Sequence, residues 1–195
     1  MKQKLLHKLN KRHGFSLTEM LATVLIMGFV GIIITTGAAT VQRVYRKVVA
    51  HANAQTALTT TITLMKDQLA FADPESIEDG SGTGAFSGVS QTISFQNLNS
   101  GEQTITLNPG TANRGFTLSY TAGDGTGTGT ASTTTLPLLS DSAITSDLCV
   151  CFDTDGGFTW DPTTKVITVT NLVAKDTRTD TVQARASFKV LLVNG

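Results

Sequence analysis

Hydrophobic and polar positions divide the first third of the chain into two different helical patterns. From Met20 to Ala39 the sequence carries no charged residue, and only threonine and glycine interrupt the apolar run. About 20 apolar residues in an α-helix are long enough to cross the hydrocarbon core of a bilayer. We therefore expect residues 15–40 to form a transmembrane helix.

The helical pattern continues beyond this run, but it becomes one-sided. Apolar residues recur at steps near three and four, at Val41, Val44, Tyr45, Val48, Val49, Ala52, Leu58, Ile62, Met65 and Leu69. Such a stripe predicts an amphipathic helix half over residues 41–72, with a soluble domain packed on its apolar face. We expect Asp73-Pro74 to end the helix, because the residue before a proline is disfavoured in the α conformation.

Short runs of β-type residues follow the helix. They are Thr92–Phe95, Thr104–Leu107, Phe116–Thr121, Leu148–Phe152, Val166–Thr170 and Val182–Val193. Asn108-Pro109-Gly110 and Asp155-Gly156-Gly157 are typical of turns between strands, and the Gly/Thr tract Gly123–Thr135 is expected to be a flexible surface loop. The sequence therefore predicts an α+β fold, in which the long N-terminal helix packs on an antiparallel β-sheet ectodomain over residues 73–195.

The formal net charge of zero conceals an uneven distribution of charge. Residues 1–14 hold five of the 15 basic residues and no acidic one, whereas 14 acidic residues face seven basic ones from Ala50 onward. The basic leader favours a single-pass topology with the N-terminus in the cytoplasm. An acidic ectodomain repels phosphate groups, so general nucleic-acid binding is not expected.

A single carboxylate, Glu19, lies close to the start of the apolar run. A plain membrane anchor, or a signal peptide cut near Gly37, Ala38 and Ala39, gains nothing from this charge, because an ionisable group near hydrocarbon is costly. In a third interpretation, cleavage just before Phe15 frees an α-amino group with a pKa of about 8. This ammonium could pair with Glu19 of the same or another subunit.

The residues around this position resemble a known processing signal. Lys-Arg-His-Gly-Phe-Ser-Leu-Thr-Glu at 11–19 is similar to the prepilin motif of type IV pilins and type II secretion pseudopilins. The resemblance implies that a prepilin peptidase cuts after Gly14 and methylates Phe15, the new N-terminal residue. It also implies that Glu19 is the carboxylate used in filament assembly.

The resemblance covers mainly residues 1–50 and implies a structural, non-enzymatic function. The chain would be a subunit of a type IV pilus or related filament, held in the plasma membrane before assembly and extracellular afterwards. The implied partners are the prepilin peptidase, other pilin subunits and the pilus or secretion assembly machinery. A minor pilin, a type II secretion or DNA-uptake pseudopilin, and an anchored or secreted binding module without a filament remain alternatives.

The sequence departs from the family in two respects. The leader of 14 residues is longer than many pilin leaders. The helix also lacks the proline that many major pilins carry about 20 residues after the cleavage site, where this chain has Thr36 and Gly37.

Cys149 and Cys151 are the two cysteines of the chain. On a strand, residues two apart share a face, and their Cα atoms lie near the upper limit for a disulfide. We expect two reduced, buried thiols, with a strained redox pair or a metal site as alternatives. Some pilins close a C-terminal loop with two distant cysteines, which this spacing does not allow.

The remaining candidates are acidic or aromatic. Asp153-Thr154-Asp155-Gly156 resembles the opening of a calcium loop, but Thr164 stands where the twelfth-position glutamate belongs. We therefore expect an acidic β-turn, with Asp161 as a further cation ligand only if the loop curls back. Trp160 is expected to be a packing or turn residue. The sequence contains no catalytic constellation of histidines or paired carboxylates, so we predict no enzyme activity, no cofactor and no metal site.

Overall fold

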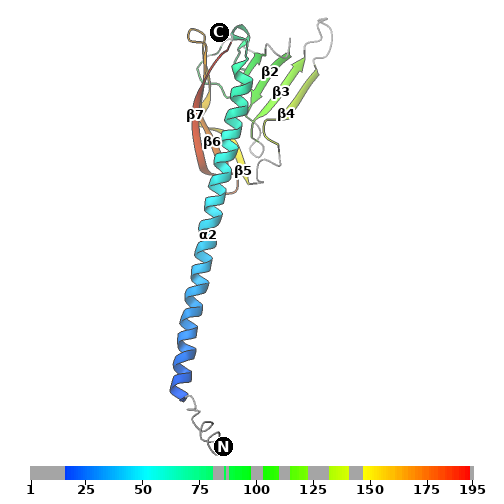
Figure 1. Ribbon diagram of the computed structural model, residues 1–195. Coiled ribbons are helices and arrows are strands. Elements are labelled where there is room, and N and C mark those ends of the chain that lie inside the picture. The colour runs from blue at the N-terminus through cyan, green and yellow to red at the C-terminus, as the bar shows by residue number, and fades with distance from the viewer. Residues whose placement is uncertain are drawn as a thin grey trace, which may run out of the picture. The chain divides into compact units, whose positions relative to one another are not determined.

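The computed structural model describes residues 16–80, 86, 88–97, 103–109, 115–122, 132–140 and 147–193. Its elements are helix α2 (Leu17–Ala70), the short 3₁₀ helix η1 (Pro74–Ser76) and the strands β1 (Ile93–Gln96), β2 (Gln103–Asn108), β3 (Thr117–Ala122), β4 (Ser132–Pro137), β5 (Leu148–Asp161), β6 (Val166–Asp176) and β7 (Thr181–Leu191) (Figure 1). One long helix followed by antiparallel sheets confirms the predicted α+β fold. The predicted leader, residues 1–14, and Phe15 lie outside the described residues.

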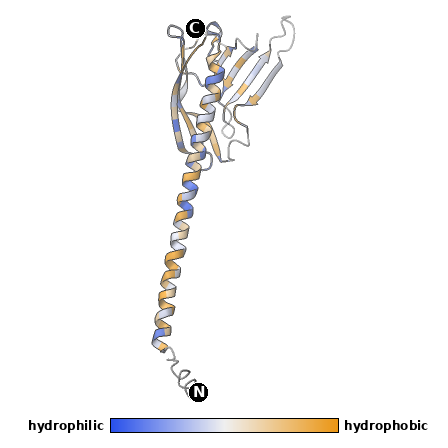
Figure 2. Ribbon diagram, viewed as in Figure 1, coloured by the Kyte–Doolittle hydropathy of each residue, from blue (hydrophilic) through white to orange (hydrophobic). Residues whose placement is uncertain are grey.

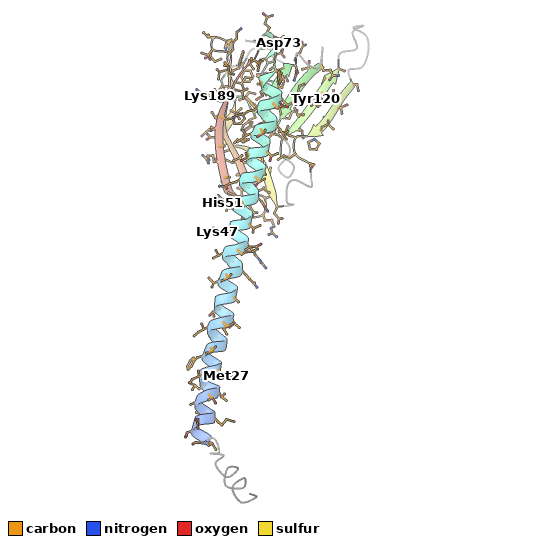
Figure 3. All side chains as sticks on the ribbon, in the orientation of Figure 1. Met27, Lys47, His51, Asp73, Tyr120 and Lys189 are labelled. Carbon is orange, nitrogen blue, oxygen red and sulfur yellow. The ribbon has the colours of Figure 1, made fainter. Side chains whose placement is uncertain are left out.

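The chain divides into two compact units, one ending at Val48 and one beginning at Val49. We call them the N-terminal unit and the β-unit. In the N-terminal unit, α2 presents large apolar side chains on all sides, and Met27 is 78% exposed (Figure 3). Figure 2 shows the predominance of hydrophobic residues along this part of the helix.

Threonine hydroxyls in the N-terminal unit are satisfied within the helix. Thr35 donates to the carbonyl oxygen of Gly31 at 2.9 Å, and Thr36 donates to that of Ile32 at 2.8 Å. Such internal bonds allow a threonine to remain in apolar surroundings, because its hydroxyl needs no water.

In the β-unit, the last part of α2 packs on the sheets. Its buried residues are Ala54, Ala57, Leu58, Thr61, Met65 and Leu69, spaced as one face of an α-helix. The prediction that the domain covers the whole apolar stripe is wrong for the segment from Val41 to Val49, whose valines are 37–68% exposed. Hydrophobic periodicity identifies an apolar face, but it does not say whether that face is covered by the same chain.

One sheet has the antiparallel strand order β1-β2-β3-β4. Its core-facing residues include Ile93, Phe95, Ile105 and Leu107, all fully buried. The Gly123–Thr135 tract was expected to be a loop, but residues 132–135 belong to β4. Threonine fits a pleated strand well, and each of these residues pairs with one on β3.

The second sheet has the order β5-β6-β7, so the β-unit has two sheets where the sequence suggested one. Asp155-Gly156-Gly157 was predicted to be a turn, but it lies inside β5, where the pairing with β6 shifts register between Phe152 and Gly157. A Cβ on Gly157 would lie 2.5 Å from the carbonyl oxygen of Ser90. Glycine here permits a close backbone approach at a bulge instead of a reversal of the chain.

A continuous apolar core joins the helix to both sheets. Phe116 and Phe158 each pack edge to face on Phe152, with ring centroids 4.9 and 5.1 Å apart. Ala70 at the end of α2 accepts a backbone hydrogen bond from Val193 at 2.9 Å. The core cluster contains residues from α2 and from both sheets. The β-unit therefore has a hydrophobic core of its own, built from Ala54 onward among the described residues.

Candidate processing and assembly site

The first turn of α2 places Glu19 at the start of the apolar helix. The carbonyl oxygen of Ser16 accepts backbone hydrogen bonds from Glu19 at 2.9 Å and Met20 at 3.1 Å, so Ser16 lies at the N-cap. The Ser16 and Thr18 hydroxyls contact each other at 2.7 Å. A carboxylate in the first turn is favourable for the helix, because it complements the partial positive charge of the unpaired N–H groups.

The surroundings of Glu19 along the helix are apolar and exposed. Met20, Leu21 and Val24 are 57%, 65% and 70% exposed. The next charged residue in α2 is Arg43, which lies about 36 Å away along the helix axis at 1.5 Å per residue. Within its own helix, Glu19 therefore has no basic partner at contact distance.

The N-terminal part of α2 meets the requirements for a membrane-spanning helix by length and composition. No residue of its most hydrophobic stretch is buried inside the described structure. The single N-terminal apolar helix fits single-pass anchoring, as the sequence analysis predicted.

The two thiols lie on β5 in a mixed environment. Cys149 is buried, as expected, whereas Cys151 is only half-buried, and both cysteines are free thiols. A hydrogen bond with Cys151 lowers the pKa of the Cys149 thiol, and Lys175, directly opposite on β6, acts in the same direction. The same hydrogen bond and burial raise the pKa of Cys151. The pair therefore holds one proton tightly and releases the other more readily.

The acidic residues near the thiols lie within strand β5, where Asp153 forms an ion pair with a neighbouring strand. Asp153 is the ion-pair partner of Arg185 on β7, and it also accepts a hydrogen bond from the backbone N–H of Thr154 at 3.0 Å. The predicted acidic β-turn at 153–156 is wrong, because these residues lie within β5 at the bulge.

Asp161 organises the tight turn between β5 and β6. Its carboxylate accepts bonds from the Thr163 backbone N–H at 2.9 Å and the Thr164 hydroxyl at 2.7 Å. These two donors lower the pKa of the carboxyl group. Across the described ranges, no three His, Cys, Asp or Glu residues form a group suited to a metal ion. Trp160 is half-buried and packs against the core, as predicted.

Sequence reasoning did not find a polar cleft beside β1. Its volume is about 360 Å³, and its lining includes the carboxylates of Asp73, Glu75 and Glu78 and the side chains of Ser94, Gln96 and Thr104. Asp73 lies just after the end of α2 (Figure 3). No signal in the sequence places this segment beside β1, because their pairing depends on the tertiary fold.

Comparison with known protein families gives a match on the N-terminal segment. The family described as the prokaryotic N-terminal methylation motif matches residues 9–35. The matched range contains Gly14, Phe15 and Glu19, the residues that the sequence analysis selected. Neither the curated proteins nor the solved structures include a significant match. Together, the motif and the apolar helix support a similarity to type IV pilin-like and pseudopilin proteins.

Proposed function

We propose that this chain is the structural subunit of a type IV pilus or a closely related filament. The observation that carries the proposal is the combination found at the start of α2. The exposed apolar part of α2 carries one carboxylate, Glu19, in its first turn and no other charge before Arg43, and a methylation motif overlaps this part of the helix. A signal peptide or a simple anchor accounts for the apolar helix but not for Glu19.

In this proposal, a prepilin peptidase removes residues 1–14 and methylates Phe15, and the mature chain remains in the membrane through α2. The N-terminus faces the cytoplasm before cleavage, and the β-unit lies outside. The assembly machinery then transfers the helix from lipid to a bundle of identical helices. The apolar side chains move from lipid to a helix bundle, both of which exclude water, so the hydrophobic effect contributes little to this transfer. Close packing between helices, including small residues such as Gly28 and Gly31, supplies much of the association energy.

Glu19 contributes the register of assembly. An ammonium at Phe15 of one subunit and the Glu19 carboxylate of another form a pair in surroundings of low dielectric. Leaving either charge unpaired there is strongly unfavourable. Subunits displaced along the filament axis would separate the two charges, so the pair selects one relative position.

The test replaces Glu19 and separates processing from assembly. We expect Glu19→Ala and Glu19→Gln to be cleaved and methylated normally but to lose filaments, because both variants remove the charge. Glu19→Gln keeps the size of the side chain, so a loss in both variants assigns the effect to the charge. Intact mass from the membrane fraction measures processing, and the amount of chain in sheared surface filaments measures assembly. Thr18→Ala, one residue away and also exposed, is the matched control and should assemble normally. Wild-type filament yield from both Glu19 variants would contradict the role assigned to the carboxylate.

A minor pilin or a pseudopilin is the second candidate. The specific observation in its favour is the absence of proline from α2, since many major pilins have one in this helix. The stoichiometry of the chain in purified filaments separates the two candidates. A major pilin is the predominant component, whereas a minor pilin is present in trace amounts.

A further inference from the structure

A basic face follows the apolar run of α2. Arg43, Arg46 and Lys47 are spaced by three and four residues, so they share one side of the helix. All three are exposed, and none takes part in an ion pair within the described part of the chain. The sequence has no acidic residue between Glu19 and Asp67. The three cations therefore have no counter-charge nearby on their own helix.

This arrangement is unfavourable unless an anion lies beside it, because like charges three or four residues apart on a helix repel each other. Basic residues of the β-unit differ in this respect. Lys175 lies 3.0 Å from the carboxylate of Asp180, and Arg178 lies 3.4 Å from that of Asp147. An anion from outside the chain would supply to the basic face what these carboxylates supply in the β-unit.

The distance from the apolar run places the basic face at the level of lipid headgroups. The run is about as long as the hydrocarbon core is thick, so its last residue, Ala39, lies near the core boundary. Arg43 and Lys47 follow about 6 and 12 Å farther along the axis, and the headgroup layer is about 5–7 Å thick. Helical side chains tilt toward the helix N-terminus, here toward the membrane, and long basic side chains extend to the interface. Figure 3 shows Lys47 farther along α2 than Met27, which belongs to the apolar run.

The opposite face of the same segment is apolar. Successive residues of an α-helix are rotated by about 100°, which places Val44, Tyr45 and Val48 on the side away from the basic face. All three are exposed, and tyrosine is typical of the boundary between membrane and water. A neighbouring helix that covers the apolar face would therefore leave the basic face open to lipid.

We propose that Arg43, Arg46 and Lys47 bind the phosphate groups of anionic phospholipids on the C-terminal side of the spanning segment. Charge complementarity favours this occupant, since a lipid presents a phosphate at the level of the three cations and acyl chains beside the apolar run. Arginine binds phosphate oxygens through two parallel N–H groups, and lysine binds them as a point charge. The contacts hold this end of the helix at one depth, because moving the cations into hydrocarbon is costly.

The inference rests on the membrane helix and not on filament formation. It adds to the proposed function in one respect. Once residues 1–14 are removed, no basic residue precedes Arg43 in the chain. The basic face would then be the main contact between the mature helix and anionic lipid.

The test measures which lipids the full chain retains. The chain is taken from its own membrane fraction in a mild detergent and equilibrated with equal amounts of phosphatidylglycerol and phosphatidylcholine that have identical acyl chains. Native mass spectrometry then counts the lipids bound to each chain. We expect wild type to prefer phosphatidylglycerol. The triple variant Arg43→Gln/Arg46→Gln/Lys47→Gln should lower this preference by about fivefold for each cation that contacts a headgroup.

The matched control is Lys66→Gln/Lys165→Gln/Lys189→Gln, which removes the same number of positive charges from the β-unit. It should keep the lipid preference of wild type. Any leader that remains on the chain contributes equally to every variant, so the comparison between variants is unaffected by processing.

Two further measurements separate this proposal from others. Glu19→Gln, which tests assembly, should not lower the lipid preference, so failure of the filament proposal and failure of this one can be distinguished. Excess inorganic phosphate at matched ionic strength should not displace phosphatidylglycerol, because it lacks acyl chains. Equal retention of the two lipids by wild type, an unchanged preference in the triple variant, an equal loss in the β-unit control, or displacement by phosphate would each overturn the proposal.

Discussion

Helix α2 is continuous from Leu17 to Ala70, but its two parts differ in whether their apolar side chains are buried. After Val49 the apolar face is buried under the sheets, and Met65 and Leu69 are fully inaccessible. Before Val49 the apolar side chains are exposed on all sides of the helix, and none belongs to the described core. The helical conformation alone therefore does not indicate function. The informative feature is the set of apolar side chains that the chain's own core leaves exposed.

The largest expected effect comes from separating the two parts. A chain that begins at Val49 should be soluble and lose membrane association completely, because the spanning segment is absent and the described core begins at Ala54. Its thermal unfolding should remain cooperative. Fractionation and circular dichroism measure the two properties. If the shortened chain were unfolded, the β-unit would depend on the N-terminal unit, and the comparison would fail.

Core substitution should sharpen the difference. Met65→Ala is expected to lower the free energy of unfolding of the β-unit by about 2–5 kcal/mol, the range for large-to-small changes at fully buried positions. Ile33→Ala, at a position that is 69% exposed, is the matched control and should leave this free energy unchanged. Urea unfolding followed by Trp160 fluorescence provides the measurement. Equal losses for both variants would mean that the two parts of α2 are stabilised alike.

Two glycines test the same contrast on a smaller scale. Gly157→Ala should destabilise the β-unit by about 1–3 kcal/mol, because the added methyl group would meet the Ser90 backbone and the Val89 side chain. Gly31→Ala meets nothing within 4 Å and should leave the β-unit unchanged. The urea measurement applies again, and a neutral Gly157→Ala would show that the close approach at the bulge can relax freely.

The thiol pair tests whether packing in the β-unit controls chemistry. Removing the hydrogen-bond donor with Cys151→Ala should raise the pKa of Cys149, because the hydrogen bond lowers it and the remaining burial opposes ionisation. Thiolate absorbance near 240 nm should therefore appear at a lower pH in the wild type than in the variant. Cys149→Ala is the complementary control: it removes the largest cause of the raised pKa of Cys151, so this thiol should ionise at a lower pH in the variant than in wild type. An identical first titration step in wild type and Cys151→Ala would contradict the proposed pairing.

The smallest expected effect concerns the β5–β6 turn. The folded-state pKa of Asp161 is lowered by its hydrogen bonds, so the stability that the carboxylate contributes is present above its unfolded pKa and is lost as the pH falls through the folded value. Asp161→Ala should show a slightly lower Tm than wild type near neutral pH, and the difference should disappear in acid. A difference that grows in acid would have the wrong sign for this mechanism.

The sequence predicted elements best where one local signal dominates. The helix was expected over residues 15–72, and Leu17–Ala70 is helical, because an apolar run, an apolar stripe and Asp73-Pro74 all act locally. Strand β4 was missed because Thr-rich composition suits both loops and strands, and only pairing with β3 decides between them. Asp155-Gly156-Gly157 was misassigned because glycine serves both turns and close backbone approaches.

The sequence likewise predicted some parts of the candidate sites and not others. Gly14, Phe15 and Glu19 could be selected because charge, apolar run and cleavage signal are contiguous in sequence. The cleft beside β1 could not be, since it depends on which strand lies at the edge of the sheet. Long-range pairing is not encoded in any short window of residues.

The measurement that tests the central claim most directly is the N-terminal sequence and intact mass of the chain from its own membrane fraction. Our account predicts a chain that begins at Phe15 with one methyl group on its α-amino nitrogen. An uncut chain, or one that begins after Ala38 or Ala39, would contradict it and would show a plain anchor or a signal peptide instead.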